Sequence, residues 1–360
     1  MDHPSAVSLV PCPHYERERV FEAVRRAVDL VGGMGRFVKP GDPVLLKANL
    51  TSIRIPASCT HPFVVGAVAR LAREAGGEVL IADAIPEHLG GLWQRVWTQV
   101  EDRLKGLDYD AASGFIEKLQ ALEDPHGVLG LVPPGASLPL FTEADLGSEA
   151  LVREQLTRVE YLDEAERVGA RCVALDALPR REVPRPDGVF LKRVLLTELL
   201  TPKTVLLNVP RLKTHNLMGY TGAVKNCFGL VPGSRRGRYH ELSRLAGCMA
   251  EMFIDIYGLA RPALSVMDGV IGMEGDGPID GDMRAIGLIA ASADGVALDA
   301  VCGSVIGLEP GEVPTTKAGA ARGLGVADLS KIPLPGEAIQ RFRISDFKRP
   351  PAKCVRRRAG

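Results

Sequence analysis

The sequence PVLLKANLTSIRIPASCTHPFVVGAVARLAREAGGEVLIAD, residues 43–83, contains two short apolar runs separated by an amphipathic segment. Residues 43–48 form the first run, which predicts a buried strand, and residues 61–75 carry apolar side chains at helical spacing. Gly76 and Gly77 end that helix, and residues 78–82 form the next strand. We therefore predict a right-handed βαβ unit in a parallel sheet.

The same alternation recurs along the chain. Further helices are predicted at 161–169, 242–257 and 296–306, and further strands at 171–175, 204–209, 263–267 and 286–290. Such alternation is typical of an α/β protein with a mostly parallel, doubly wound sheet. In these sheets ligands bind beyond the carboxyl ends of the strands, at the point where the strand order switches direction.

One long stretch does not follow this pattern. Residues 88–160 contain both tryptophans, Gly-Pro breaks and charged helical pieces, which predict an inserted helical or irregular subdomain or lid. On this division, residues 1–87 are the first part of the α/β domain and residues 161–347 are the remainder, which carries the site. Residues 348–360 are a basic tail.

Composition excludes several classes of protein. Lys and Arg together number 44, as do Asp and Glu, so no net charge attracts nucleic acid or an anionic membrane. There is no run of about 20 uninterrupted apolar residues and no signal peptide, so we expect a cytoplasmic protein without a membrane partner. Seven scattered cysteines without a CxxC pair predict no intrinsic iron–sulfur cluster.

The segment richest in chemistry is NVPRLKTHNLMGYTGAVKNCFGLVPGSRRGRYH, residues 208–240. It begins where an apolar strand ends, and it combines five glycines with lysines, histidines and arginines. Glycine-rich backbone lets N–H groups approach an anion, and nearby cations neutralise it. We interpret the segment as the loop of a carboxylate or phosphate site, in which Arg236 and Arg238 are the weakest candidates. The alternative is an ordinary basic surface loop.

A second cluster is MDGVIGMEGDGPIDGDM, residues 267–283. Carboxylates from Asp268, Glu274 and Asp276 predict a divalent metal site for Mg²⁺ or Ca²⁺, although their spacing is not that of a calcium-hand loop. One alternative is a chain of Asp-Gly turns. Another is that these acids pair with the cations of residues 208–240, in which case the nearest charges lie within about 8 Å.

The candidate site residues fall into two groups. Histidine and partly desolvated lysine are the usual groups for proton transfer near neutral pH, and burial is expected to lower the pKa of Lys225. We expect acid–base roles for Lys225, His215 and His240, and substrate-binding roles for Lys213, Arg235, Asn226, Lys47, Asn49, Thr60 and Asp83. Thr60 is alternatively the cap of the helix that follows it.

Several known motifs are absent. The sequence has no GxxxxGK[ST] and no GxGxxG after the first strand, which counts against a P-loop and against a dinucleotide site. It also lacks a GxSxG elbow and an HExxH metal motif.

Five segments together resemble the uncharacterised DUF362 family. They are KANL (47–50), the residues from 60 to 84, VPRLKTHNLMGYTGAVKNCFGLVPG (209–233), MDGVIGMEGDGP (267–278) and ADGVALDAVCGSVIGL (293–308). Many members carry a ferredoxin-like module with clustered cysteines. This chain lacks such a module, so the resemblance implies that any electron-transfer partner is a separate protein. The pattern TGAVKN…VPG…H is also distantly similar to the lysine–histidine loop of nickel-pincer lactate racemases, which favours racemase, epimerase or redox chemistry on a small hydroxy acid.

These observations predict an enzyme that acts on a small anionic molecule by lysine and histidine acid–base chemistry. The alternative is a non-catalytic accessory protein that binds a ligand or cofactor within a biosynthetic pathway. The first reading requires at least one lysine or histidine with a strongly shifted pKa, whereas the second requires only satisfied ion pairs. Either reading is compatible with a monomer or a homo-oligomer.

Overall fold

In the computed structural model, the described residues are 3–51, 58–84, 160–175 and 178–350. The predicted insertion at 88–160 lies outside these ranges except for its last residue, as does most of the predicted tail at 348–360. The division into these segments therefore stays a prediction.

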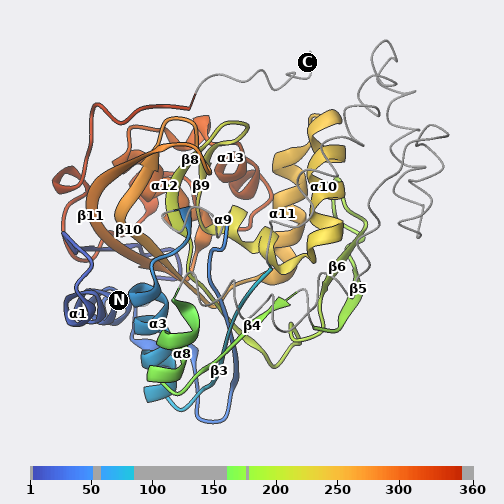
Figure 1. The fold of residues 1–360 in the computed structure, drawn as a ribbon. Helices are drawn as coiled ribbons and strands as arrows, with labels where there is room; N and C mark the ends of the chain where they lie inside the picture. The colour runs from blue at the N-terminus through green and yellow to red at the C-terminus, as the bar shows by residue number, and fades with distance from the viewer. Residues whose placement is uncertain (1–2, 52–57, 85–159, 176–177, 351–360) are drawn as a thin grey trace.

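A nine-stranded sheet forms the centre of the described residues (Figure 1). Its main path runs β1 (Ser8–Pro11), β11 (Asp282–Ser292), β10 (Leu264–Glu274), β7 (Val205–Asn208), β2 (Pro43–Lys47), β3 (Glu78–Asp83) and β4 (Arg171–Ala174). The strands from β10 to β4 are parallel, whereas β1, β11 and β10 pair antiparallel. Beyond β7, β8 (Arg211–His215) pairs with β10, and β9 (Gly219–Thr221) pairs with β8. The prediction of a mostly parallel α/β sheet is confirmed.

Helices cover both faces of this sheet (Figure 1). In β2, Val44 and Leu46 pack into one core with α1 (Arg17–Asp29), α3 (Pro62–Glu74) and α8 (Tyr161–Arg167), while Leu45 packs on the opposite side with α11 (Met249–Ala260). β2 is thus apolar on both faces, as parallel strands between two helical layers are. The doubly wound arrangement follows from this pattern.

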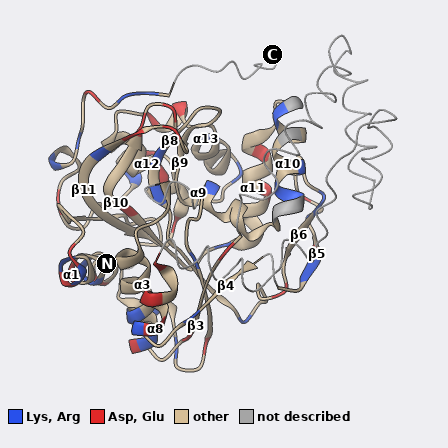
Figure 2. Cartoon of the chain, viewed as in Figure 1, with Lys and Arg blue, Asp and Glu red and all other residues tan. Residues whose placement is uncertain are grey.

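Further helices complete the two layers. They are α2 (Met34–Phe37), α9 (Ala223–Asn226), α10 (Gly233–Leu245), α12 (Gly295–Val305), α13 (Pro314–Ala321) and the 3-10 turns η4 (Cys227–Leu230), η5 (Pro310–Glu312), η6 (Leu329–Lys331) and η7 (Ile339–Arg341). Four arginines lie on α10, and its ribbon is blue at several points in Figure 2. Among the described helices, none has the length and the apolar character needed to cross a membrane.

Three expectations from the sequence are corrected. The helix expected at 242–257 is two helices, α10 and α11, because Gly247 between them adopts a positive φ of 66°. The expected loop at 208–240 is mostly regular structure, namely β8, β9, α9, η4 and part of α10. The first part of the acidic segment 268–282, up to Glu274, belongs to β10, which pairs antiparallel with β11.

The structure also contains strands that the sequence did not reveal. β1 pairs with β11, although about 270 residues separate the two in the chain. A separate two-stranded sheet consists of β5 (Arg180–Pro184) and β6 (Arg193–Thr197).

Candidate functional site

The candidate site lies where the strand order switches direction. The chain passes from β2 to β3 on one side of β2, and β7 lies on the other side. Lys47 ends β2, Asp83 ends β3 and Asn208 ends β7. Because the three strands are parallel, these polar side chains meet at the same edge of the sheet, where α/β proteins bind their ligands.

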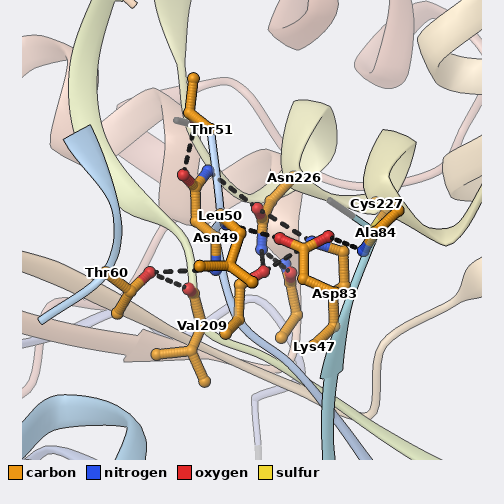
Figure 3. Close-up of polar contacts among 12 residues, drawn as sticks. Lys47, Asn49, Leu50, Thr51, Thr60, Asp83, Ala84, Val209, Asn226 and Cys227 are labelled. Atoms are coloured by element: carbon orange, nitrogen blue, oxygen red, sulfur yellow. Dashed lines mark hydrogen bonds and ion pairs between the residues drawn. The ribbon is translucent and has the colours of Figure 1, made fainter. Parts of the chain in front are cut away.

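Lys47 and Asp83 form a buried ion pair (Figure 3). The Lys47 Nζ lies 2.9 Å from Asp83 Oδ1, and it donates to the backbone oxygen of Ala48 at 2.5 Å and to Asn226 Oδ1 at 3.5 Å. Burial lowers the pKa of Lys47, and the Asp83 carboxylate opposes that shift. All three ammonium hydrogens point at protein oxygens, which favours a positioning role over the predicted substrate contact.

Gly229 in η4 packs directly on this ion pair. A Cβ atom at this position would lie 2.4 Å from Asp83 Oδ1 and 2.6 Å from Lys47 Nζ. Both distances are far shorter than a van der Waals contact, and both atoms are held by their partners. Glycine is therefore required here, and the backbone of η4 covers the pair.

Asn226 connects α9 to the ends of the strands. Its Oδ1 accepts from Asn49 Nδ2 at 2.9 Å (Figure 3). Its Nδ2 donates to Asn208 Oδ1 at 2.8 Å and to the Ala48 oxygen at 3.2 Å. Asn208 in turn donates to the Ala223 oxygen at 3.0 Å. The amide of Asn226 is thus fully used in fixing α9 against β2 and β7.

Lys213 is buried in β8 without a carboxylate partner among the described residues. It donates to Asn49 Oδ1 at 3.1 Å, to the Ser58 oxygen at 2.7 Å and to Thr51 Oγ1. Burial above all, with the positive charges of Lys225 and Arg211, holds its pKa well below the ordinary value. Its Nζ is therefore surrounded by neutral oxygens, and no carboxylate among the described residues compensates a positive charge at this position.

Lys225 on α9 differs from the other two lysines. No hydrogen bond or ion pair joins its Nζ to another described residue, and the half-buried side chain places Nζ 5.1 Å from the ring centroid of Phe253. Burial, together with the positive charges of Arg236 and Lys47, lowers the pKa of Lys225 to about 8. The predicted lowering of this pKa is confirmed.

His215 ends β8 close to these lysines. Its Nδ1 accepts from the backbone N–H groups of Leu217 at 3.1 Å and Met218 at 3.3 Å. Burial and the positive charges of Lys225, His240 and Lys213 hold the pKa of His215 well below its ordinary value, so the ring is neutral. With Nδ1 used as an acceptor, the hydrogen of the neutral ring sits on Nε2.

The structure brings together the three side chains expected to act as acids or bases. Lys225 and His240 both act electrostatically on His215. The His240 ring, on α10, lies 6.3 Å from the ring of Phe228, and Phe228 packs edge-on against Phe253. These aromatic rings form an apolar wall beside the amine of Lys225.

Asp299 is a site residue that the sequence analysis missed. Its carboxylate, fully buried in α12, accepts from the N–H groups of Ala223 at 2.6 Å and Val224 at 3.0 Å and so holds the start of α9. Burial raises the pKa of Asp299 to about 7, which these two hydrogen bonds oppose. A Cβ on Gly222 would lie 2.0 Å from Asp299 Oδ1, so only glycine fits there. An aspartate inside the apolar run of residues 295–306 was the available signal.

Two substrate-binding predictions fit the geometry less well. Thr60 donates to the Val209 oxygen at 2.7 Å and accepts from the Asn49 N–H at 3.2 Å, so it bridges strand ends. It does not cap α3, because His61 is the N-cap and accepts from the Phe63 N–H. The charge of Arg235 acts electrostatically on Arg238 and Tyr239. Arg236 instead donates to the backbone oxygen of Ala84, the residue after β3, at 3.3 Å.

The predicted metal ligands do not form one set. Asp268 pairs with Arg211 at 3.3 Å and accepts from Tyr15 at 2.7 Å, while Glu274 accepts from the Lys348 N–H at 3.1 Å. The two residues are six positions apart along β10, a span of about 20 Å. Within the described residues, no group of three or more His, Cys, Asp or Glu side chains is arranged to hold a metal ion. The alternative of pairing between residues 208–240 and 268–282 is confirmed by the Arg211–Asp268 contact.

Comparisons with known proteins identify relatives of this chain. The family model described as Domain of unknown function (DUF362) matches residues 127–304. The thylakoid-associated protein sll1697 of Synechocystis sp. (strain ATCC 27184 / PCC 6803 / Kazusa) is 31% identical over 322 residues, which cover 89% of this chain and 80% of the relative. Among solved structures, the lactate racemase apoprotein from Thermoanaerobacterium thermosaccharolyticum matches with a TM-score of 0.40 and 11% identity. That match covers 85% of this chain and 59% of the racemase chain.

Proposed function

The chain belongs to the DUF362 family, and we propose that it is an enzyme acting on a small carboxylate- or phosphate-bearing molecule by lysine and histidine acid–base chemistry. The observation that carries this proposal is the amine of Lys225. It is half-buried, has a pKa of about 8, and lacks a hydrogen-bonding partner among the described residues. A buried cation without a counterion is stabilised by an anionic ligand.

Lys225 and His215 would then have complementary roles. The ammonium of Lys225 binds the anion, and after losing its proton the amine serves as a general base near neutral pH. The neutral ring of His215 has its Nδ1 in use and offers the Nε2 hydrogen to a substrate oxygen. Lys47, Asp83 and Asn226 hold the elements that carry these groups.

A binding assay with a matched control tests this proposal. Inorganic phosphate, oxalate and a set of 2-hydroxy acids are titrated calorimetrically into the wild-type protein, Lys225→Ala and Lys331→Ala. Lys331 is 73% exposed and pairs with Asp328 on the surface, so its variant controls for the loss of one positive charge. At 100 times the dissociation constant, a bound anion raises the free energy of unfolding by about 2.7 kcal/mol, which a thermal melt detects.

We expect at least one probe to stabilise the wild type and Lys331→Ala but not Lys225→Ala. Lys225→Arg should recover little, because the guanidinium is larger and stays protonated. If Lys225→Ala melts far earlier but still binds every probe that the wild type binds, Lys225 is a structural residue and the proposal is wrong.

A second candidate is the accessory protein that binds a ligand without reaction. The hydrogen bonds of Lys47 and Lys213 support this candidate, because both amines are fully hydrogen-bonded to protein oxygens and so form a rigid binding site. Exchange in D₂O separates the two. An acid–base enzyme incorporates deuterium at C2 of a bound 2-hydroxy acid or at C3 of a bound 2-oxo acid, and Lys225→Ala abolishes the exchange. An accessory protein binds the probe without exchange.

A further inference from the structure

The three lysines of the site differ in how their amines are used. Lys47 directs its hydrogens at Asp83, Ala48 and Asn226, and Lys213 directs its hydrogens at Asn49, Thr51 and Ser58. Forming a bond to either nitrogen would first require breaking these contacts. Among the described residues, Lys225 Nζ has no such contact to break.

The surroundings of Lys225 suit a reactive amine. Its nitrogen lies over the face of Phe253, and the adjoining ring of Phe228 extends the same apolar wall. At pH 7 an amine with a pKa of about 8 is roughly one-tenth unprotonated, whereas an ordinary lysine is unprotonated well below one part in a thousand. Only the unprotonated amine is a nucleophile.

We propose that Lys225 forms an imine with the carbonyl carbon of a small 2-oxo acid, an inference that rests on the proposed function and names a substrate class for its site. The nitrogen lone pair adds to the carbonyl, and the C=O double bond becomes a carbinolamine. The carbinolamine then loses water. Nitrogen gives up both of its hydrogens, the carbonyl gives up its oxygen, and no oxidant or reductant is consumed.

The charges nearby explain why the carbonyl partner is an anion. Three other cations lie within electrostatic range of Lys225. The charges of Lys47 and Arg236 act on Lys225, and the charge of Lys225 acts on Lys213. Among the described residues, Lys47 is the one of these three that is paired with a carboxylate. A carboxylate next to the reacting carbonyl would offset this excess of positive charge. The neutral His215 ring lies within electrostatic range of Lys225 and would assist the proton transfers of dehydration.

Reductive trapping tests the proposal. Pyruvate is incubated with the full chain at pH 7 in the presence of cyanoborohydride, which reduces an imine to a stable secondary amine, and peptide mapping by mass spectrometry locates the adduct. Lys225→Arg keeps the positive charge but cannot form the imine, and Lys331→Arg is the matched control. Because the wild-type map alone assigns the modified lysine, the test does not depend on the folding of a variant.

We expect the adduct on Lys225 to exceed that on Lys331 by at least about tenfold, since the fractions of unprotonated amine differ by roughly two hundredfold. It should be lost in Lys225→Arg and retained in Lys331→Arg. Labelling of Lys225 that is no greater than labelling of exposed lysines overturns the imine. If oxalate still binds in a Lys225-dependent way in that case, the imine is wrong and the proposed anion site stands.

Discussion

Removing the Asp83 carboxylate should destabilise the protein much more than removing an exposed one. Asp83→Ala leaves the ammonium of Lys47 buried without its counterion, and breaking such a pair costs about 3–5 kcal/mol. It also leaves the N–H groups of Leu50 and Ala84 without their acceptor, each worth about 1–3 kcal/mol when buried. These costs are not additive, and deprotonation of Lys47 would reduce the cost of leaving its charge unpaired. We therefore expect a total near the pair value, about 3–5 kcal/mol.

Urea unfolding followed by far-ultraviolet circular dichroism at pH 7 measures this loss. Asp328→Ala is the matched control, because Asp328 pairs with Lys331 at 3.2 Å on the surface, where a pair is worth about 0–1 kcal/mol. The double variant Lys47→Met/Asp83→Leu should lose less than Asp83→Ala, since it leaves no unpaired charge. A loss for Asp83→Ala no larger than that for Asp328→Ala would refute the view that this pair frames the site.

Three further predictions concern α9 and the residues that hold it. The pKa of Lys225 is lowered to about 8 in the folded protein, so the unfolded chain binds more protons between pH 8 and about 10.5. The free energy of unfolding of the wild type, relative to that of Lys225→Met, should therefore rise with pH across that range. Urea midpoints that change in parallel for the two proteins would contradict this. Asp299→Ala should lower the free energy of unfolding by about 1–3 kcal/mol and weaken oxalate binding in calorimetry. Asp299→Asn should be less affected, because one acceptor oxygen remains. Unchanged oxalate affinity in Asp299→Ala would show that Asp299 does not position the site. Gly229→Ala should lower the melting temperature through an overpacking cost of about 1–3 kcal/mol. Gly311→Ala should not, because the space around Gly311 is open. Equal melting temperatures for the two variants would show that η4 accommodates the added methyl group at little cost.

The β2–α3–β3 unit could be predicted from the sequence because its signals are local. Helical spacing runs through residues 61–75, and paired glycines separate this helix from the next strand. β8 and the second half of β10 gave no comparable signal. Their residues are glycine-rich or charged, and they become strands because they pair with each other.

Part of the site could also be predicted, because parallel strands bring their carboxyl ends together. Lys47, Asn49 and Asp83 do meet there with Asn226 and Lys213. The sequence could not tell which lysine would lack a partner among the residues that the structure describes, since Lys213 and Lys225 both occur in the same polar segment. That difference depends on the oxygens of Asn49, Thr51 and Ser58, which surround Lys213 only after folding.

Asp299 shows a different limit of sequence reasoning. It is about 75 residues from the N–H groups that it accepts from, and its helix otherwise looks like a wholly apolar core element. The aspartate stands out in this apolar run, but nothing local to it indicates that its partner is the segment after Gly222.

A direct measurement of the Lys225 amine tests the central claim, that this residue is the unpaired cation of an anion site. Lysines are dimethylated with ¹³C, the Lys225 signal is assigned by its loss in Lys225→Arg, and it is titrated by NMR with and without saturating oxalate. We predict titration near pH 8 in the absence of oxalate and at a higher pH in its presence, because a bound anion stabilises the ammonium. Titration near the ordinary lysine value of about 10.4, unchanged by oxalate or by inorganic phosphate, would contradict the account.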